Sequence, residues 1–230
     1  MAFRGPSAPS LEPDVAYCPP EGALSVWYAD AQLVVLDKPA GLLTVPGRGP
    51  DRRDSLATRA AGLFADVLIV HRLDMATSGL VALGRGADAQ RALSAAFARR
   101  QVAKAYEAWV HGLMADEAGE IDLPLATDWP RRPRQMVCHQ LGKPSLTRYR
   151  VLARDAAANR TRVRLEPVTG RSHQLRVHLL ACGHPIVGDP LYGDPALQAA
   201  WPRLMLHASA LSLPHPVTGD EVRVHSAPPF

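Results

Sequence analysis

The sequence contains no apolar run that approaches the length of a membrane span, and its first residues contain no apolar core of a secretory signal. A membrane-spanning helix needs about 20 predominantly apolar residues, and a signal peptide needs an apolar stretch of about 7–15 residues. Residues 1–22 instead carry five prolines and few apolar side chains, which predicts a disordered or extended tail. We therefore expect a soluble, cytoplasmic protein without a membrane partner.

Cysteine is scarce, and the nine histidines are scattered singly along the chain. The spacing of Cys18, Cys138 and Cys182 fits no zinc pattern, so we expect free thiols and no metal site. The sequence also lacks a P-loop and the nucleophile elbow of the α/β-hydrolases. Glycosidases usually place two carboxylates across one bond, and the acid that draws most attention below, Asp74, has no second carboxylate near it in sequence.

The 230 residues are 47% hydrophobic, which is enough for one large domain. No clean linker interrupts residues 23–230, so we expect a single domain over that range. Alternating apolar patterns predict more strands than helices, many of them joined by short turns. Residues 87–100 have helical spacing, Ser55 is placed to cap a short helix, and residues 172–183 read as a helix. This pattern predicts an α+β fold with a mixed, mostly antiparallel central sheet flanked by helices.

The net charge of +4 permits a polyanionic partner without requiring one. The arginines gather in a few stretches, among them WPRRPRQ around residue 131 and TGRSHQLRVH around residue 175. Arginine is favoured where a planar fork must hold phosphate. A solvated arginine-rich surface explains each cluster equally well.

The segment IVHRLDMATSGLVAL, residues 69–83, places Arg72 and Asp74 in one loop between two apolar strands. A lone aspartate there is commonly a turn-capping residue. Arg176 favours a functional role for Asp74 over turn capping. It lies in a helix that we expect to bury Leu175, Leu179 and Leu180 on one side. An arginine on such a helix must reach a buried or cleft-lying anion, and Asp74 is the natural candidate.

A paired carboxylate stays ionised and oriented, which suits Asp74 to act as a nucleophile or base. Tyr106, in the predicted strand QVAKAYEAWVHG, offers a flat ring on which a nucleobase can stack. Taken alone, that tyrosine fits a half-buried strand residue equally well.

The sequence HRLDMATSGL resembles the catalytic motif of the RluA-type pseudouridine synthases. Four further stretches agree with that family in the same order: LVVLDKPAGLLTVPGR, RQVAKAYEAWVHG, PVTGRSHQLRVHLLACGHPIVGDPLY and LMLHASALSLPHPVTG. The resemblance begins near residue 24 and implies one pseudouridine synthase catalytic domain with a central RNA-binding cleft. We expect no counterpart of the N-terminal S4 domain that is frequent in this family. The chain is most similar to the members that act on both 23S ribosomal RNA and the anticodon stem-loop of transfer RNA.

The resemblance also implies roles for individual residues. Asp74 matches the essential aspartate, Arg176 the arginine paired with it, and Tyr106 the tyrosine that stacks on the target uracil. Arg72 matches the arginine that fills the gap left by the flipped base. Leu175 lines the uracil pocket, and the remaining substrate contacts fall to His71, Thr77, Arg171 and His173. From clustering alone, we assign phosphate contacts to Arg48, Arg52, Arg131, Arg132 and Arg134.

The implied reaction breaks the C1′–N1 bond of uridine, turns the uracil and joins C5 to C1′. It involves no redox step and no water, so we expect no cofactor, and we expect a monomer without an obligate protein partner. Three alternatives stay open. They are the same chemistry on another ribosomal or transfer RNA uridine, a non-catalytic RNA-binding protein of the same fold, and a hydrolytic N-glycosidase.

Overall fold

The computed structural model describes residues 17–230, so residues 1–16 of the predicted tail lie outside the described residues. The described part of that tail forms neither helix nor strand and lies against the segment that leads into the first helix. The Tyr17 hydroxyl donates to the Asp54 carbonyl at 3.0 Å, and Arg59 donates to the Pro20 carbonyl at 2.7 Å. No helix of the described chain is long and apolar enough to cross a membrane.

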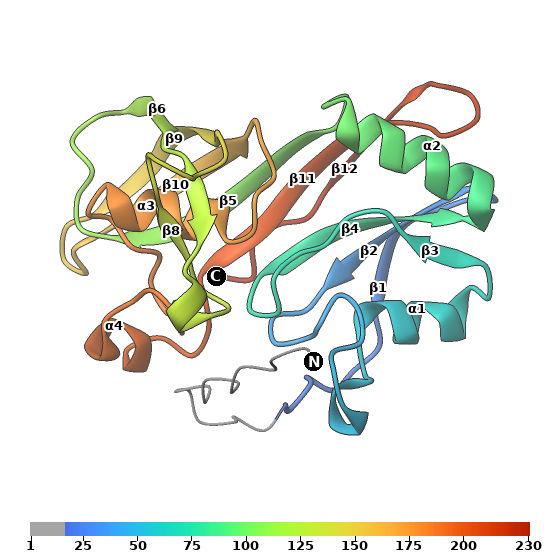
Figure 1. Ribbon diagram of the computed structural model, residues 1–230, viewed down its shortest axis with the longest axis horizontal. Coiled ribbons are helices and arrows are strands. Elements are labelled where there is room, and N and C mark those ends of the chain that lie inside the picture. The colour runs from blue at the N-terminus through green and yellow to red at the C-terminus, as the bar shows by residue number, and fades with distance from the viewer. Residues whose placement is uncertain (1–16) are drawn as a thin grey trace, which may run out of the picture.

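A ten-stranded sheet runs through the molecule in the order β1-β2-β4-β11-β5-β10-β9-β6, with β3 also paired to β4 and β12 to β11 (Figure 1). Among the described residues, only β4 and β11 pair in parallel, and the other pairings are antiparallel. The predicted α+β fold with a mixed, mostly antiparallel sheet is confirmed. The strands of this sheet are β1 (Ser25–Ala29), β2 (Leu33–Lys38), β3 (Val67–Ile69), β4 (Ser78–Arg85), β5 (Ala103–His111), β6 (Ala118–Asp122), β9 (Leu146–Asp155), β10 (Arg160–Pro167), β11 (Leu206–Pro214) and β12 (Glu221–His225).

The remaining elements are four helices, two 3-10 turns and a hairpin. They are α1 (Leu56–Leu63), α2 (Gly86–Ala98), α3 (Gln174–Ala181), α4 (Pro195–Ala199), the turns Pro50–Arg52 and Trp129–Arg131, and the hairpin strands β7 (Leu125–Thr127) and β8 (Gln135–Val137). Ser55 caps α1 as predicted, because its side chain accepts a hydrogen bond from the Thr58 amide.

The parallel pairing of β4 with β11 joins the two halves of the sheet at its centre. Gly79 of β4 lies opposite Ala208 of β11 and has a φ of 114°. A Cβ atom at Gly79 would lie 2.4 Å from the Ala208 carbonyl oxygen, so no larger residue fits this contact. The loop that carries Asp74 leads directly into this strand and is thereby fixed at the middle of the molecule.

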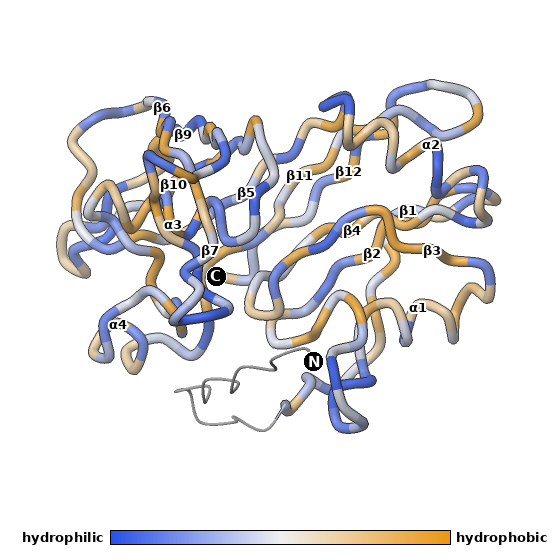
Figure 2. The backbone as a smooth tube through the Cα atoms, viewed as in Figure 1, coloured by the Kyte–Doolittle hydropathy of each residue, from blue (hydrophilic) through white to orange (hydrophobic). Residues whose placement is uncertain are grey.

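Three apolar clusters form the core. One lies between α3 and strands β5 and β10, one beneath α2, and one beneath α1. Figure 2 shows hydrophobic residues concentrated along the central strands β2 and β4, and every residue from Leu80 to Leu83 is buried. The loop that carries Asp74 therefore leads into a fully buried strand, where local opening is expected to be rare.

Several sequence expectations are wrong in detail. Residues 113–133 read from the sequence as a loop rich in Asp, Trp, Pro and Arg, but they contain β6 and β7, which are short and carry exposed polar residues that hide the strand pattern. The alternation in residues 101–112 cannot place Val102, Tyr106 and Val110 on one face, which made a bulge possible there. The structure has the bulge in the partner strand β11, between Ala208 and Ala210. Leu180 is 39% exposed, so the buried face of α3 is formed by Leu175, Val177 and Leu179 rather than by Leu180.

Candidate active site

Backbone and side-chain hydrogen bonds hold the loop between β3 and β4 from below. Thr44 Oγ1 donates to the Leu73 carbonyl at 2.7 Å and accepts from the Leu73 amide at 3.2 Å. The Gly41 amide donates to the Met75 carbonyl at 2.8 Å. These bonds fix the residues on both sides of Asp74, so its carboxylate is presented from a rigid loop.

Lys38, at the end of β2, is fully buried beneath the same loop. Its ammonium donates to the carbonyls of Pro39, Leu42 and Met75 at 3.0, 2.7 and 3.0 Å. Burial lowers the pKa of Lys38 to about 7, and the nearby charge of Asp74 opposes this shift. The lysine therefore ties β2 to the loop through main-chain acceptors and places a positive charge below Asp74.

Arg176 of α3 joins two carboxylates. Its Nη1 lies 3.2 Å from Asp74 Oδ2, which is the ion pair predicted from the sequence. Its Nε and Nη2 form a bidentate pair with Asp189 at 2.8 and 2.6 Å, and both of these side chains are buried. Burial lowers the pKa of Arg176, but the hydrogen bonds and charges of Asp189 and Asp74 outweigh it and raise the pKa. The guanidinium is therefore permanently charged and fixed in position.

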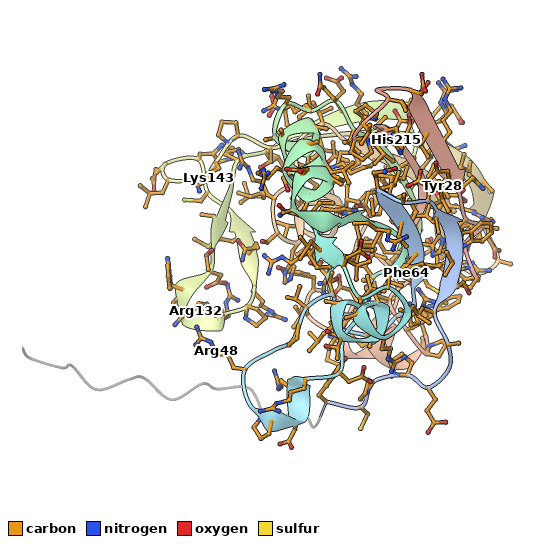
Figure 3. The ribbon with its side chains drawn as sticks, turned by 90° about the vertical axis from the view of Figure 1, so that its right-hand side faces the viewer. Tyr28, Arg48, Phe64, Arg132, Lys143 and His215 are labelled. Carbon is orange, nitrogen blue, oxygen red and sulfur yellow. The ribbon has the colours of Figure 1, made fainter. Side chains whose placement is uncertain are left out.

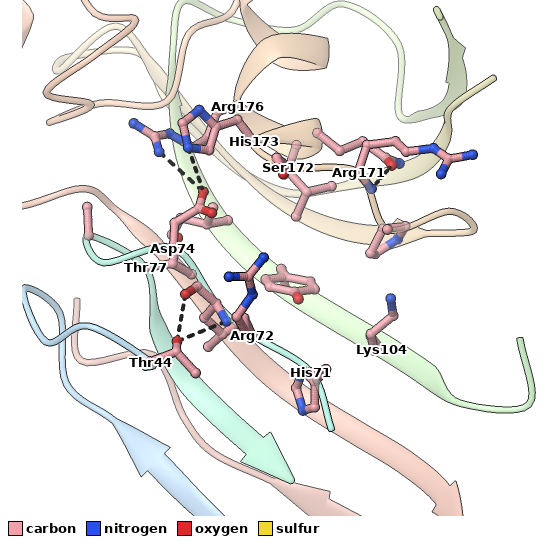
Figure 4. Close-up of a pocket in the computed structure, with 18 of the residues that line it drawn as sticks. Thr44, His71, Arg72, Asp74, Thr77, Lys104, Arg171, Ser172, His173 and Arg176 are labelled. Carbon is pink, nitrogen blue, oxygen red and sulfur yellow. Dashed lines mark hydrogen bonds and ion pairs between the residues drawn. The ribbon is translucent and has the colours of Figure 1, made fainter. Parts of the chain in front are cut away.

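His173 lies beside this ion pair (Figure 4), and Tyr192 contacts both His173 and Arg176. His173 adopts a left-handed backbone conformation at the start of α3, and its Nε2 lies 3.9 Å from Asp74 Oδ2. Its Nδ1 pairs with the Tyr192 hydroxyl at 2.7 Å. Burial lowers the pKa of His173, with Asp74 opposing the shift, so the imidazole beside Asp74 is neutral near pH 7.

Tyr106 and Leu175 form the apolar wall of the cleft next to Asp74. Tyr106 comes from β5 and is half-buried, whereas Leu175 is buried at the start of α3. Burial raises the pKa of the Tyr106 hydroxyl, and the charge of Asp74 raises it further. The phenol therefore stays protonated, and its ring is available as a flat surface rather than as a base.

The remaining loop residues differ in how far they reach into the cleft. Arg72 is exposed and lines the cleft (Figure 4). The His71 ring instead accepts the Ala82 amide at 2.9 Å and stacks on Phe97 with ring centroids 4.5 Å apart. Thr77 is buried and lines the cleft floor. Arg72 thus extends from this loop into the cleft, whereas His71 fixes the loop to the sheet.

The cleft is strongly basic. Ten lysine and arginine side chains line it against two carboxylates, Asp74 and Glu166. The basic residues are Arg52, Arg72, Arg100, Lys104, Arg132, Arg148, Arg164, Arg171, Arg176 and Arg223. A cleft lined by one sign of charge concentrates ligands of the opposite sign, so this one suits a polyanion.

The structure divides the five arginines that were assigned to phosphate contacts. Arg48 and Arg52 are exposed in the segment before α1, and Arg52 lines the cleft. Arg131 is instead paired with the buried Asp128 at 2.7 Å. Arg134 donates to the Leu191 carbonyl and lies 5.8 Å from the Tyr192 ring. Arg132 lines the cleft, so clustering in sequence did not separate arginines that support the protein from those that face the cleft.

Three contributors to the site were missed from the sequence: Lys38, Thr44 and Asp189. The motifs LDKPAGLLTVP and GDPLYG contain them, but nothing in the local pattern shows that they meet the Asp74 loop. Among the described residues, no group of three His, Cys, Asp or Glu side chains is arranged to hold a metal ion. The arrangement can hold an ionised, oriented carboxylate against a flat ring inside a basic cleft, which suits nucleophilic or base chemistry on a nucleobase or its sugar.

Comparison with known proteins supports this chemistry. Residues 32–181 match the family model described as RNA pseudouridylate synthase. The dual-specificity RNA pseudouridine synthase RluA of Yersinia pestis is 50% identical over 194 residues, which cover 84% of this chain and 94% of that protein. The corresponding enzyme of Pasteurella multocida is 47% identical over 94% of this chain and 99% of its own length.

Solved structures agree with the sequence comparisons. Human RNA pseudouridylate synthase domain containing 1 superposes with a TM-score of 0.76 at 30% identity, covering 96% of this chain and 87% of that chain. Human RNA pseudouridylate synthase domain containing 4 gives a TM-score of 0.71 at 26% identity, covering 89% and 88%. The fold and the order of the sequence motifs thus agree along nearly the whole described chain.

Proposed function

Because the chain belongs to the RNA pseudouridylate synthase family, we propose that it isomerises specific uridines in two classes of RNA, 23S ribosomal RNA and the anticodon stem-loop of transfer RNA. The isomerase activity on RNA follows from the family. The two substrate classes rest on the relatives from Yersinia pestis and Pasteurella multocida, which are named dual-specificity enzymes. The reaction takes place in the cytoplasm, on RNA alone, and without an obligate protein partner.

The observation that carries the proposal is the position of Asp74. Its Oδ2 lies 3.2 Å from the guanidinium of Arg176, which Asp189 holds in place. Asp74 lines the floor of the basic cleft together with Tyr106. A carboxylate held in this way is correctly aimed at a bound sugar or base. Asp74 attacks C1′, adds to C6 of uracil, or removes the C2′ proton. In each of these routes the C1′–N1 bond breaks, the uracil turns, and C5 joins C1′.

The cleft residues account for the handling of the base. A uridine in folded RNA must be flipped out, which costs a few kcal/mol. Stacking on Tyr106 returns about 1–3 kcal/mol, Leu175 covers the uracil edge, and Arg72 occupies the gap left in the RNA. Arg171, exposed at the start of α3, and His173 contact the flipped nucleotide, while Thr77 shapes the floor.

Release of tritium from uridine labelled at C5 tests the proposal, because C5 loses its hydrogen when it bonds to C1′. The wild-type protein and Asp74→Asn are compared on transfer RNA and on a 23S fragment. Release from both RNAs by the wild type, lost in a variant that still binds RNA, supports the proposal. Near-normal release by Asp74→Asn refutes the role of Asp74, and release from one RNA alone refutes dual specificity.

A non-catalytic RNA-binding protein is the competing function. It predicts tight binding of both RNAs and no tritium release from either by the wild type. A hydrolytic N-glycosidase predicts free uracil in the supernatant instead of pseudouridine in the RNA. Digestion of the product RNA and chromatography of its nucleosides separates these outcomes in the same samples.

A further inference from the structure

The hairpin formed by β7 and β8 carries three arginines in the segment DWPRRPRQ, and the structure gives them three different surroundings. Arg131 pairs with the buried Asp128 at 2.7 Å. Arg134 reaches back to the Leu191 carbonyl and the Tyr192 ring, which ties the hairpin to the segment that holds Asp189. These two arginines therefore have protein partners that support the hairpin.

Arg132 is different. Its guanidinium lies over the Trp129 ring, 4.6 Å from the ring centroid. Within residues 17–230 no carboxylate pairs with Arg132, and its side chain is exposed and lines the cleft. An exposed arginine normally samples many rotamers, and holding one against an aromatic ring reduces that freedom. The Trp129 ring thus orients the charge and the flat face of this guanidinium, which has no carboxylate partner among residues 17–230.

Packing in the protein core does not account for the tryptophan at position 129. It is 68% exposed, in contrast to the usual pattern in which tryptophan is largely buried. It begins the 3-10 turn Trp129–Arg131 at the tip of the hairpin, and Figure 3 shows this hairpin standing away from the body of the molecule with Arg132 near its tip. Thr127, Pro133 and Gln135 of the same hairpin line the cleft beside Arg132. The pair is therefore at the cleft mouth, where RNA nucleotides next to the target would lie.

We propose that an unpaired base of the RNA loop, outside the target uridine, stacks on the Arg132 guanidinium, which Trp129 holds flat. Unstacked loop bases are bound in this way on arginine planes and aromatic rings. The inference rests on the proposed function and adds a second base-binding position to it. Arg132 is the recognition residue, and Trp129 is a positioning residue that acts through it. Only RNA loops that can turn out a second base at the right distance gain this contact.

The substitution Arg132→Lys tests the claim, because it keeps the charge and removes the flat face. We expect kcat/KM on the RNA stem-loop to fall about 10- to 100-fold, the range for loss of one stacked base. Trp129→Ala gives a similar fall, whereas Trp129→Phe keeps most of the activity. Arg91→Lys, at an exposed arginine of α2 outside the cleft, is the matched control for the charge. Trp27→Ala removes another exposed tryptophan, 49% exposed on β1. Both controls stay within about twofold of the wild type.

A set of stem-loops in which one non-target loop nucleotide at a time is replaced by an abasic site identifies the stacked base. We expect one abasic position at which kcat/KM of the wild type falls as far as kcat/KM of Arg132→Lys falls on intact RNA. At that same position, the abasic site should not lower kcat/KM of Arg132→Lys any further. If Arg132→Lys instead matches the wild type on intact RNA while Arg132→Gln is weakened in a salt-dependent way, the contact is a phosphate and the inference is wrong. Equal losses at every abasic position overturn it as well.

The two proposals fail separately. Absence of tritium release by the wild type on intact RNA refutes the proposed function. In that case the same abasic set, read as binding affinity, still decides whether a base stacks on Arg132. Wild-type turnover together with an unaffected Arg132→Lys variant refutes only the stacking inference.

Discussion

Arg176 is bound more closely to Asp189 than to the residue that it orients. Two nitrogens of its guanidinium contact the Asp189 carboxylate at 2.6 and 2.8 Å, and one contacts Asp74 at 3.2 Å. Asp189 Oδ1 also accepts the amides of Leu191 and Tyr192. Asp189 therefore neutralises and aims the arginine, and Asp74 keeps a carboxylate oxygen outside this ion pair.

Asp189→Asn is expected to damage both stability and activity. Removing one partner of a buried ion pair leaves an uncompensated charge, which costs about 3 kcal/mol or more in the free energy of unfolding. An Asn amide also faces an arginine N–H without being able to accept from it. We expect kcat to fall about 10- to 100-fold because Arg176 no longer holds the Asp74 carboxylate in one orientation. Urea unfolding and tritium release measure the two effects.

The matched control for this substitution is Glu120→Gln. Glu120 pairs with Arg148 at 2.8 Å, but both side chains are more than half exposed. Such a pair contributes at most about 1 kcal/mol. Equal destabilisation by Glu120→Gln and Asp189→Asn would contradict the special position of the buried pair.

Lys38→Met is expected to loosen the loop that carries Asp74. The substitution has a similar size but leaves three carbonyls without their shared donor, at a cost of about 2–3 kcal/mol. Because one of those carbonyls belongs to Met75, activity should fall further than the loss of folded protein explains. Specific activity per folded molecule, with folding followed by circular dichroism, checks this. Lys143→Met, at an exposed lysine, should change neither quantity.

The stability of the protein should decrease in mild acid because of His71. Burial lowers the pKa of His71 to about 3, and the charge of Lys104 adds to this shift, whereas the unfolded chain binds the proton near 6.5. Between pH 6.5 and 3 the unfolded state binds more protons, so the free energy of unfolding falls as the pH falls. Above pH 6.5 this contribution is fully present.

Urea unfolding at pH 7, 6 and 5 on the wild type and on His71→Gln isolates that contribution. Glutamine offers an oxygen acceptor for the Ala82 amide but does not titrate. Between pH 6 and 5 the wild type should lose about 1 kcal/mol more than the variant. Parallel losses in the two proteins would show that His71 is already protonated in the fold or stays exposed to solvent.

Tyr106→Leu is expected to lower kcat/KM about 10- to 100-fold through the loss of base stacking. Leucine keeps an apolar side chain against the core, so the melting temperature should change little. Tyr106→Phe should lose less, since within residues 17–230 the Tyr106 hydroxyl has no hydrogen-bond partner. A Tyr106→Phe variant as weak as Tyr106→Leu would assign the function to the hydroxyl instead of the ring.

The sequence by itself determined the local features. Apolar runs predicted the strands around the Asp74 loop, and Ser55 predicted the start of α1. These two predictions are confirmed because each depends on residues that are neighbours along the chain. The motif HRLDMATSGL predicts Asp74 as the central acid, which stays a prediction. The short, polar strands β6 and β7 were missed because their patterns are too brief to distinguish from loops.

Only the tertiary structure decided which charges meet. The bidentate pair of Arg176 with Asp189 was not predicted, and the parallel pairing of Ser78 with His207 joins strands that lie 129 positions apart in the sequence. Lys38 drew no attention in the sequence and is fully buried beneath the Asp74 loop. Arg131, Arg132 and Arg134 looked alike and have three different partners. Periodicity fixes which face of an element is apolar, but the partner of a buried charge depends on which distant element packs against it.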